Sequence, residues 1–406
     1  MPRPQPAVIF IFITLFLDIF GIGLVVPVLP GLVEELQGGS VEAASHAVGW
    51  LGALYALMQF IFSPILGSLS DRFGRRPVIL VSLLGAALDY LLLAWAPSMV
   101  WLFVGRIISG ITAANFSAAS AYIADVTSPE KRAAGFGMIG AAFGLGFIAG
   151  PAVGGLLGEF GLRLPFLVAA GVTALNWIYG IFVLPESLTP ENRRAFDWLS
   201  VNPFKSLVAL ARWPVVSGLA GAQFLMNLSH NIYPSLWVLY TGFRYGWSTR
   251  TVGLSLCVVG LTSAIVQGAL AGNIIRRMGE RRAVLFGLGL MSVAMVCYGL
   301  ATEGWMIFVT IILGSIGGVA GPAEQSLISQ AVPADEQGAV QGALNSLASV
   351  AGVIGPLVWT WIFAASLGTN GTLNFPGLAF IIAGVLTLIA LAVAVRVLNR
   401  WSPNKA

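Results

Sequence analysis

Four ionisable residues lie inside long apolar stretches of this sequence: Asp18, Asp89, Arg106 and Glu324. A charge at the centre of a bilayer costs roughly 2.5–3.5 kcal/mol even on insertion-based scales, so each side chain needs a partner, a water-filled cavity or a proton. A carboxyl group in an apolar site can bind a proton near neutral pH, and a nearby arginine changes how tightly it does so. We therefore predict that these four residues couple the protein to protons. Glu324 lies near the end of its apolar stretch and has a second interpretation as a solvated helix end.

Asp89 and Arg106 lie at equal distances before and after a short turn at Pro97 and Ser98. Two antiparallel helices joined by that turn place both side chains at one depth. We expect them to interact directly, through water or through a third helix, either as a charge relay or as a permanent ion pair that fixes packing. Asp18 lies near the middle of its apolar stretch and has no basic residue nearby in sequence. It is predicted to bind a proton or a cationic substrate, with a hydrogen bond between helices as the alternative.

The composition excludes a soluble globular protein. Hydrophobic residues make up 57% of the 406 residues and charged residues 9%, and the mean hydropathy is +0.87. These values are typical of a polytopic membrane protein. The net charge of +4 does not indicate nucleic-acid binding, because the basic residues are sorted to one side of the predicted membrane. The two cysteines lie in apolar stretches and the two histidines are far apart, so neither a disulfide framework nor a metal site is predicted.

The elements that position these residues are predicted to be membrane-spanning helices, because about twenty apolar residues are needed to cross roughly 30 Å of hydrocarbon. The predicted spans are residues 8–33, 48–69, 77–96, 100–124, 133–158, 163–184, 214–240, 250–273, 282–300, 304–330, 338–366 and 375–397. The charged segment 185–212 is predicted to be a cytoplasmic linker. The expected fold is an all-α membrane protein of twelve helices, with a six-helix half at 1–184 and another at 213–406.

The sequence contains an internal repeat with an offset of 205 residues. The stretch 67–77 has a second copy at 272–282, and the Gly-Pro pair at 150–151 recurs at 355–356. Two unrelated landmarks in one register indicate a duplicated unit. Because each half has six predicted spans, the two pseudo-symmetric halves are expected to share one orientation in the membrane.

The stretch 67–77 places four charged residues between two apolar stretches, so it must be a short loop at one membrane face. Loops rich in arginine stay in the cytoplasm, and most other basic residues fall on the same side, which places both termini there. Asp71 is predicted to bind the amino-terminal dipole of a helix from the other half, with membrane orientation alone as the alternative role of the loop. The residues predicted to gate the conformational change are Gly67, Asp71, Arg72, Gly74, Arg75, Arg76, Gly150 and Pro151.

Glycines recur at four-residue spacing around Gly150 and Pro151, at positions 146, 150, 154 and 158. This spacing puts them on one helix face and predicts a close approach of a neighbouring backbone. A tight packing seam and a seam on which the two halves rock are both compatible with the pattern.

These motifs resemble the major facilitator superfamily and, within it, the drug/proton antiporters of the tetracycline-efflux type. The stretch 67–77 is similar to the superfamily's signature loop between its second and third helices, and 272–282 to the degenerate second copy. Residues 17–30, 106–110 and 146–155 resemble motifs in the first, fourth and fifth helices of the efflux group. The resemblance covers nearly the whole chain. It implies a monomeric secondary transporter of the inner membrane that exports its cargo by proton antiport and alternating access, with no cofactor beyond the proton gradient.

Two positions differ from that resemblance. Tetracycline pumps carry an acid in the ninth helix and a histidine in the eighth, and the matching positions here hold Met291 and Ser263. Because a tetracycline–metal chelate is cationic and polar, the two differences favour a related cargo over tetracycline itself.

In the family arrangement the cargo is held between the halves at mid-membrane. The residues predicted to contact it are Tyr55, Gln59, Asn115, Phe116, Asn227, His230, Asn231, Tyr233 and Trp237. Aromatic walls with a few amides suit an amphipathic organic molecule. Each of these side chains has an alternative role as an interface anchor or as a hydrogen bond between helices.

We therefore expect an exporter of a small, drug-like compound whose partners are that compound, protons and the lipid bilayer, without nucleic acid or metal. The first alternative is a proton symporter that imports a small metabolite such as a sugar or organic acid. The second is a membrane-embedded enzyme, which is disfavoured because no catalytic constellation or phosphate-binding loop occurs in the sequence.

Overall fold

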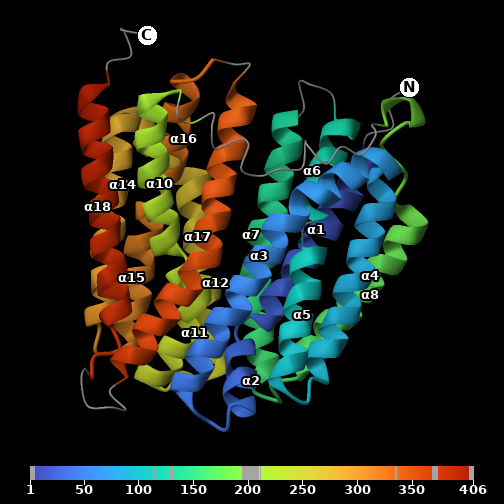
Figure 1. Cartoon of the computed structure of the whole chain (residues 1–406), viewed down its shortest axis with the longest axis horizontal. Helices are drawn as coiled ribbons and strands as arrows, with labels where there is room; N and C mark the ends of the chain where they lie inside the picture. Colours follow the sequence, from blue (N-terminus) through green and yellow to red (C-terminus); the bar gives the residue numbers. More distant parts are fainter. Residues whose placement is uncertain are drawn as a thin grey trace. The chain divides into compact units, whose positions relative to one another are not determined.

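A computed structural model gives the fold of the chain (Figure 1) and describes residues 5–113, 115–127, 132–193, 210, 212–333, 336–367 and 374–401. The side chains of residues 5–8, 115, 116, 132–136 and 214 are outside this description. Helices joined by short turns make up nearly all of the described chain, and no strand occurs in it.

The helices of the first half are α1 (Gln5–Val25), α2 (Leu29–Leu36), α3 (Val41–Phe73), α4 (Arg75–Ala94), α5 (Met99–Thr112), α6 (Asn115–Val126), α7 (Arg132–Gly158) and α8 (Leu164–Val183). The helices of the second half are α10 (Pro214–His230), α11 (Ile232–Tyr245), α12 (Thr249–Ile265), α13 (Ala271–Met278), α14 (Glu280–Leu300), α15 (Gly304–Gly317), α16 (Ala320–Gln330), α17 (Gln337–Ser366) and α18 (Leu378–Arg400). A π-helical turn, Val266–Leu270, joins α12 to α13.

Within the described residues, eleven helical segments are long and apolar enough to cross a membrane. They match eleven of the twelve predicted spans. The remaining one, predicted at 214–240, consists of α10 and α11, which are 17 and 14 residues long and meet at Asn231. The polar residues Asn227, Ser229, His230 and Asn231 lie within this stretch and make it less apolar than the other spans.

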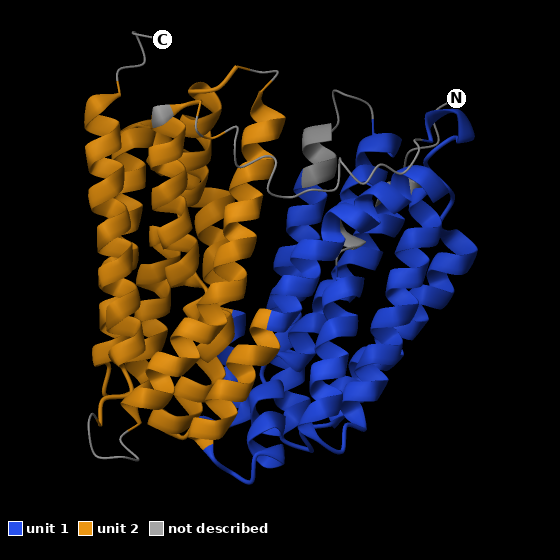
Figure 2. Cartoon of the chain, in the orientation of Figure 1, with its two compact units in different colours: residues 1–40, 54–202, 247–257 blue, residues 41–53, 203–246, 258–406 orange. Residues whose placement is uncertain are grey.

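The chain forms two compact units (Figure 2). Unit 1 contains residues 1–40, 54–202 and 247–257, and unit 2 contains the remainder. Two segments pack in the other unit from most of their own half. Segment 41–53 belongs to the first half by sequence but packs in unit 2, and segment 247–257 belongs to the second half but packs in unit 1. The predicted halves remain a prediction, and most of the predicted linker lies outside the described residues.

Glycines permit the close packing of both of these segments in the unit that receives them. In unit 1, segment 247–257 lies on α7 so closely that a Cβ on Gly155 would stand 3.0 Å from the Cα of Gly253. In unit 2, segment 41–53 lies on α17, and a Cβ on Gly52 would stand 3.1 Å from the Cβ of Pro356. The two segments lie about one repeat offset apart in sequence, so equivalent parts of the two repeats pack in the other unit.

The glycine spacing predicted in the fifth span forms a close contact between α7 and α1 inside unit 1. A Cβ on Gly150 would lie 2.7 Å from the Cα of Gly23, and a Cβ on Gly154 would overlap the backbone of Leu24. Gly146 faces Ile19 in the same way. The predicted packing seam is therefore present, while the rocking of two halves on it stays a prediction.

The internal repeat is also visible in the backbone. Gly74 and Gly279 precede α4 and α14 with φ of +106° and +77° and ψ of 158° and 154°. These are positive-φ conformations that only glycine adopts readily, so the same turn starts both helices. Each unit has its own apolar core, around Leu83 and Tyr122 in unit 1 and around Leu288 and Ala343 in unit 2.

Candidate functional site: an intramembrane charge cluster and a polar loop network

Asp89 and Arg106 lie together in unit 1, as their spacing predicted, but they do not pair directly. Asp89 on α4 is 1% exposed, and its Oδ1 atom has no hydrogen-bond partner among the described residues. No ion pair joins it to Arg106 in the described chain. The guanidinium of Arg106 instead lies 5.7 Å from the ring centroid of Tyr55 on α3, a cation–π contact from a third helix. Gly105 brings the α5 backbone against the carboxyl, since a Cβ there would lie 2.8 Å from Asp89 Oδ1.

Asp18 belongs to the same neighbourhood. The charges of Asp18, Asp89 and Arg106 all act on the hydroxyls of Tyr55 and Tyr90. Side chains from α1, α3, α4 and α5 therefore converge, and we call these five residues the charge cluster. The three ionisable residues predicted in the first half are thus gathered at one place, while their role in proton coupling stays a prediction.

Glu324 lies apart from the charge cluster, on α16 in unit 2. It is 2% exposed, and its Oε1 atom has no hydrogen-bond partner among the described residues. Its neighbours Ala320 and Ala323 belong to the apolar core of unit 2. The interpretation as a solvated helix end is therefore wrong, because apolar side chains enclose the carboxyl.

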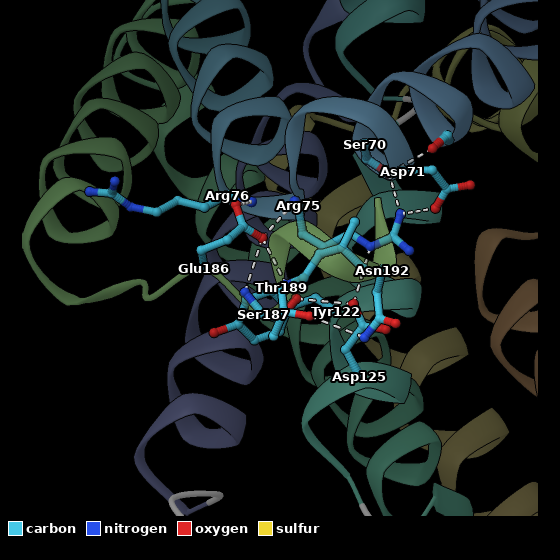
Figure 3. A network of polar contacts seen from close by, with 12 residues as sticks. Ser70, Asp71, Arg75, Arg76, Tyr122, Asp125, Glu186, Ser187, Thr189 and Asn192 are labelled. Carbon is cyan, nitrogen blue, oxygen red and sulfur yellow. Dashed lines mark hydrogen bonds and ion pairs between the residues drawn. The ribbon is translucent and has the colours of Figure 1, made fainter. Parts of the chain in front are cut away.

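The loop between α3 and α4 is organised around Arg75 (Figure 3), which is 8% exposed. Its Nη1 lies 2.5 Å from Asp71 Oδ1 and donates to Ser70 Oγ at 2.6 Å, and its Nε donates to Asp125 Oδ2 at 3.2 Å. Asp71 therefore has a partner in its own loop, and its predicted binding to a helix of the other half stays a prediction. Arg72 is exposed and lies 5.1 Å from the Phe73 ring, so the arginines of this loop differ in environment.

Glu186 caps the start of α4 from a segment more than a hundred residues further along the chain (Figure 3). Its Oε1 accepts from the backbone N–H of Arg75 at 2.9 Å and its Oε2 from that of Arg76 at 3.2 Å. A carboxylate at a helix amino terminus satisfies free N–H groups and interacts favourably with the helix dipole. Gly74 is required beside it, because a Cβ at that position would overlap the carboxylate.

Sequence reasoning missed Glu186 and Asp125. Glu186 lies in the charged segment 185–212 that the sequence predicts to be a linker, and Asp125 stands in the last turn of α6. The available signal was their position, since each is a carboxylate at the end of a predicted span on the side of the arginine loop. Ser187 links them, because its hydroxyl donates to Asp125 Oδ2 at 3.1 Å and its N–H to Glu186 Oε1 at 3.0 Å.

Replacing Glu186 with alanine is expected to lower the melting temperature of the purified protein. The loss of a side-chain cap typically costs about 0.5–2 kcal/mol, and this carboxylate accepts from four backbone N–H groups. Glu191→Ala is the matched control, because Glu191 is an exposed carboxylate in the same segment. Equal melting temperatures for the two variants, measured by scanning fluorimetry in detergent, would contradict the capping role.

The residues predicted to contact cargo in the seventh span lie around the junction of α10 and α11. Asn231 donates to the carbonyl of Asn227 at 2.8 Å, and His230 is exposed with its ring 5.0 Å from that of Tyr233. Trp237 is 2% exposed and packs at 5.2 Å against the Tyr298 ring. In this structure Trp237 thus stabilises the interior of unit 2, whereas His230 is accessible.

The other predicted contacts are described only in part. Tyr55 and Gln59 lie at the contact between α3 and α5. Gly110 permits this contact, since a Cβ at that position would lie only 2.7 Å from the carbonyl oxygen of Tyr55. The side chains of Asn115 and Phe116 lie outside the described residues. Gly67 faces Ser117, with 3.7 Å from its Cβ position to the Oγ.

Comparison with known proteins identifies the family. The sequence model of the Major Facilitator Superfamily matches residues 11–356 and 219–406. The chain is 43% identical over 400 residues to the class C tetracycline resistance protein of Escherichia coli, covering 98% of each chain. It is 42% identical to the class B protein of Escherichia coli, with 90% of each chain covered.

Solved transporter structures share the fold. A crystal structure of the nucleoside transporter NupG has a TM-score of 0.79 at 12% identity and covers 96% of this chain and 99% of that one. The human organic anion transporter MFSD10 has a TM-score of 0.70 at 26% identity and covers 97% of this chain and 100% of that one. The matched fold and the identity over nearly full length lead to one conclusion: the chain belongs to the Major Facilitator Superfamily and, within it, to the family of the tetracycline resistance proteins.

Proposed function

We propose that this chain exports a small amphipathic organic compound in exchange for protons, by alternating access. The observation that carries the proposal is its 43% identity, over 98% of both chains, with the class C tetracycline resistance protein. Export of a drug is the transport reaction that produces resistance. The family consists of transporters, so the alternative of a membrane-embedded enzyme is wrong.

Proton coupling is assigned to the charge cluster, with Asp18 as its proton-binding group. Asp89 supports this assignment because a buried carboxylate without an ion pair is costly, and the cation of Arg106 is close enough to act on it. Glu324 supplies a second buried carboxyl group in unit 2. The gating and cargo residues predicted from the sequence keep those assignments in this proposal.

The cargo is proposed to be related to tetracycline in size and amphipathic character. Met291 is 7% exposed and packs against Gly317, so an apolar thioether lies where the resemblance predicts an acid. Ser263 stands where it predicts a histidine. A less polar or monovalent cationic compound suits these positions better than a metal chelate does.

We place the protein in the inner membrane as a monomer, with both termini cytoplasmic and with six-helix halves at 1–184 and 213–406. The basic loop 67–77 supports this orientation through the preference of arginine-rich loops for the cytoplasm. No cofactor is required beyond the proton gradient.

Replacing Asp18 with asparagine is expected to abolish gradient-driven transport, because the amide cannot bind and release a proton. The measurement is uptake of tetracycline and of a fluorescent cationic dye into inverted vesicles that hold a proton gradient. Wild-type protein should accumulate at least one of the two compounds, and an uncoupler should stop it. Asp18→Asn should retain less than about a tenth of this uptake, in line with the contribution of proton transfer in other proteins.

Glu303→Gln is the matched control, because Glu303 is an exposed carboxylate at the start of α15. Full gradient-driven uptake by Asp18→Asn would refute the role of Asp18. Gradient-driven uptake of a sugar or organic acid into right-side-out vesicles would instead establish the importer.

A further inference from the structure

Three buried oxygen atoms between α1 and α8 have no hydrogen-bond partner among the described residues: Thr14 Oγ1, Thr173 Oγ1 and Asn176 Oδ1. Their side chains are 2%, 1% and 1% exposed, respectively. The contact that joins the two helices here is a bond from Asn176 Nδ2 to the carbonyl oxygen of Thr14 at 3.2 Å. Buried polar groups are nearly always satisfied, so three unsatisfied ones on two neighbouring helices require an explanation. We call these three residues the polar seam.

The polar seam lies on the helix face that carries Asp18. Thr14, Asp18 and Gly21 are four and three residues apart, which places them on one side of α1. Gly21 marks where this face meets the charge cluster, because a Cβ at that position would lie 3.4 Å from both Thr173 Oγ1 and the Tyr90 hydroxyl. Tyr90 in turn interacts with the charge of Asp18. Hydroxyl groups therefore extend from the seam to the surroundings of Asp18.

The second half provides an internal comparison. The repeat position of Thr14 is Leu219, which is 0% exposed in the apolar core of unit 2. Between α10 and α18, the counterparts of α1 and α8 in span order, Ser229 donates to the Ala383 carbonyl oxygen at 2.6 Å and lies 2.9 Å from Thr387 Oγ1. The hydroxyls at that seam are satisfied by protein atoms. Gln223 on α10, at the repeat position of Asp18, also has a buried Oε1 without a partner. It is the one such atom on α10 or α18 among the described residues, whereas α1 and α8 bring three together.

We propose that the polar seam binds ordered water that hydrates Asp18, a step that deepens the proposed function and rests on it. The seam offers two hydroxyl groups, which both donate and accept, and one amide oxygen, which accepts. A buried water typically makes two to four hydrogen bonds to such groups, and neutral ligands suit it. Asp18 is half-buried. Hydration from the seam side stabilises its ionised carboxylate and so favours release of the proton.

Other titratable groups near Asp18 also affect its proton affinity. Away from the helix ends, the titratable residues with described side chains on α3 to α8 are Tyr55 on α3, Asp89 and Tyr90 on α4, Arg106 on α5, Tyr122 and Asp125 on α6 and Tyr179 on α8. Glu42, His46, Asp71 and Arg72 on α3 and Arg75 and Arg76 on α4 lie towards the ends of their helices. Tyr179 stacks on Phe10 at 4.8 Å, and Tyr122 and Asp125 belong to the loop network. The neutral seam is what α8 adds at the level of Asp18.

Two variants test the seam without touching a charge. Gly21→Ala fills the space beside Thr173 and Tyr90 with a methyl group at ordinary contact distance and keeps every polar group. Asn176→Leu removes the amide acceptor. Gly314→Ala is the matched control, because its Cβ would lie 3.6 Å from the hydroxyl of Tyr298 in unit 2.

The measurement is the protonation of Asp18 in purified protein, followed by infrared difference spectroscopy as the pH is varied, with the carboxyl band identified by its loss in Asp18→Asn. In Gly21→Ala and Asn176→Leu we expect the proton affinity of Asp18 to rise about tenfold, because the ionised form loses hydration. Gly314→Ala should leave the titration unchanged. An unchanged titration in folded Gly21→Ala would overturn the proposal, and this variant decides the matter if Asn176→Leu does not fold.

Sodium is the competing occupant of the seam. If sodium in place of potassium lowers the proton affinity of Asp18 in the wild type, and Gly21→Ala removes that effect, the seam holds a cation and the water proposal is wrong. No cargo or gradient is used, so failure here is distinguishable from failure of the proposed transport. A chain that transports nothing can still show the predicted titration.

Discussion

Replacing Gly154 with alanine is expected to destabilise the protein by about 3 kcal/mol or more. A Cβ at this position would overlap the backbone of Leu24 on α1, and a backbone atom cannot turn away as the end of a flexible side chain can. Overpacking a well-packed interior typically costs 1–3 kcal/mol, and occasionally more, so a collision with the main chain belongs at the upper end of that range. The α7 helix would have to separate from α1 along its length.

The same helix supplies the control for this prediction. Cβ atoms on Gly140 and Gly144 would meet no described atom within 4 Å. Alanine at either position is expected to leave stability unchanged or to raise it, since alanine is favoured over glycine in a helix by roughly 0.8–1 kcal/mol. The measurement is the melting temperature and the monodispersity of each variant in detergent. Equal behaviour of Gly154→Ala and Gly144→Ala would show that the α1–α7 contact is looser than this structure has it.

The spans were predictable from the sequence because the bilayer fixes the length of an apolar helix. Breaks within a span were not predicted: 100–124, 214–240 and 304–330 each consist of two helices, namely α5 and α6, α10 and α11, and α15 and α16. Hydropathy does not register a break between helices when both sides remain moderately apolar. The glycine contact of α7 was predictable as well, because four-residue spacing describes a helix face without reference to its partner.

Partners distant in sequence were not predictable in the same way. Arg72 and Arg75 are equivalent in the sequence, and only the fold decides that Arg75 is buried while Arg72 is exposed. Glu186 reaches the start of α4 across 111 residues, a separation that no local pattern encodes. Asp89 and Arg106 were placed at one depth by their spacing, but depth does not determine the rotation of each helix. Of the predicted arrangements (direct, through water or through a third helix), the structure shows a guanidinium contact with Tyr55 on a third helix and no direct ion pair among the described residues.

Replacing Arg75 with alanine is expected to have the largest effect of any substitution in the arginine loop. Arg75 is 8% exposed and is the shared partner of Asp71, Asp125 and Ser70. Removing one member of a buried ion pair costs about 3–5 kcal/mol, because the remaining charge is left without compensation. Here two carboxylates lose their cation together, although the side chain of Asp71 is 40% exposed and water can solvate it in part.

Arg72→Ala is the matched control, with the same change of charge on the neighbouring face of the loop. Its guanidinium contacts the Phe73 ring at 5.1 Å and is exposed, so its removal is expected to cost less than about 1 kcal/mol. Melting temperatures of the two variants in detergent distinguish burial from net charge. If both variants lose the same stability, the loop responds to total charge, and the specific contacts of Arg75 are unimportant.

A double-mutant cycle then separates the Arg75–Asp125 contact from the rest of the network. Asp125→Asn in the wild type removes one carboxylate and leaves Asp71 to neutralise the arginine, so a modest loss is expected. Asp125→Asn on the Arg75→Ala background removes an unpaired charge and is expected to restore part of the lost stability. The coupling energy should fall in the range of 0.5–3 kcal/mol found for residues in contact. Additive losses would mean that Arg75 stabilises the loop through its side-chain contacts with Asp71 and Ser70 rather than through Asp125.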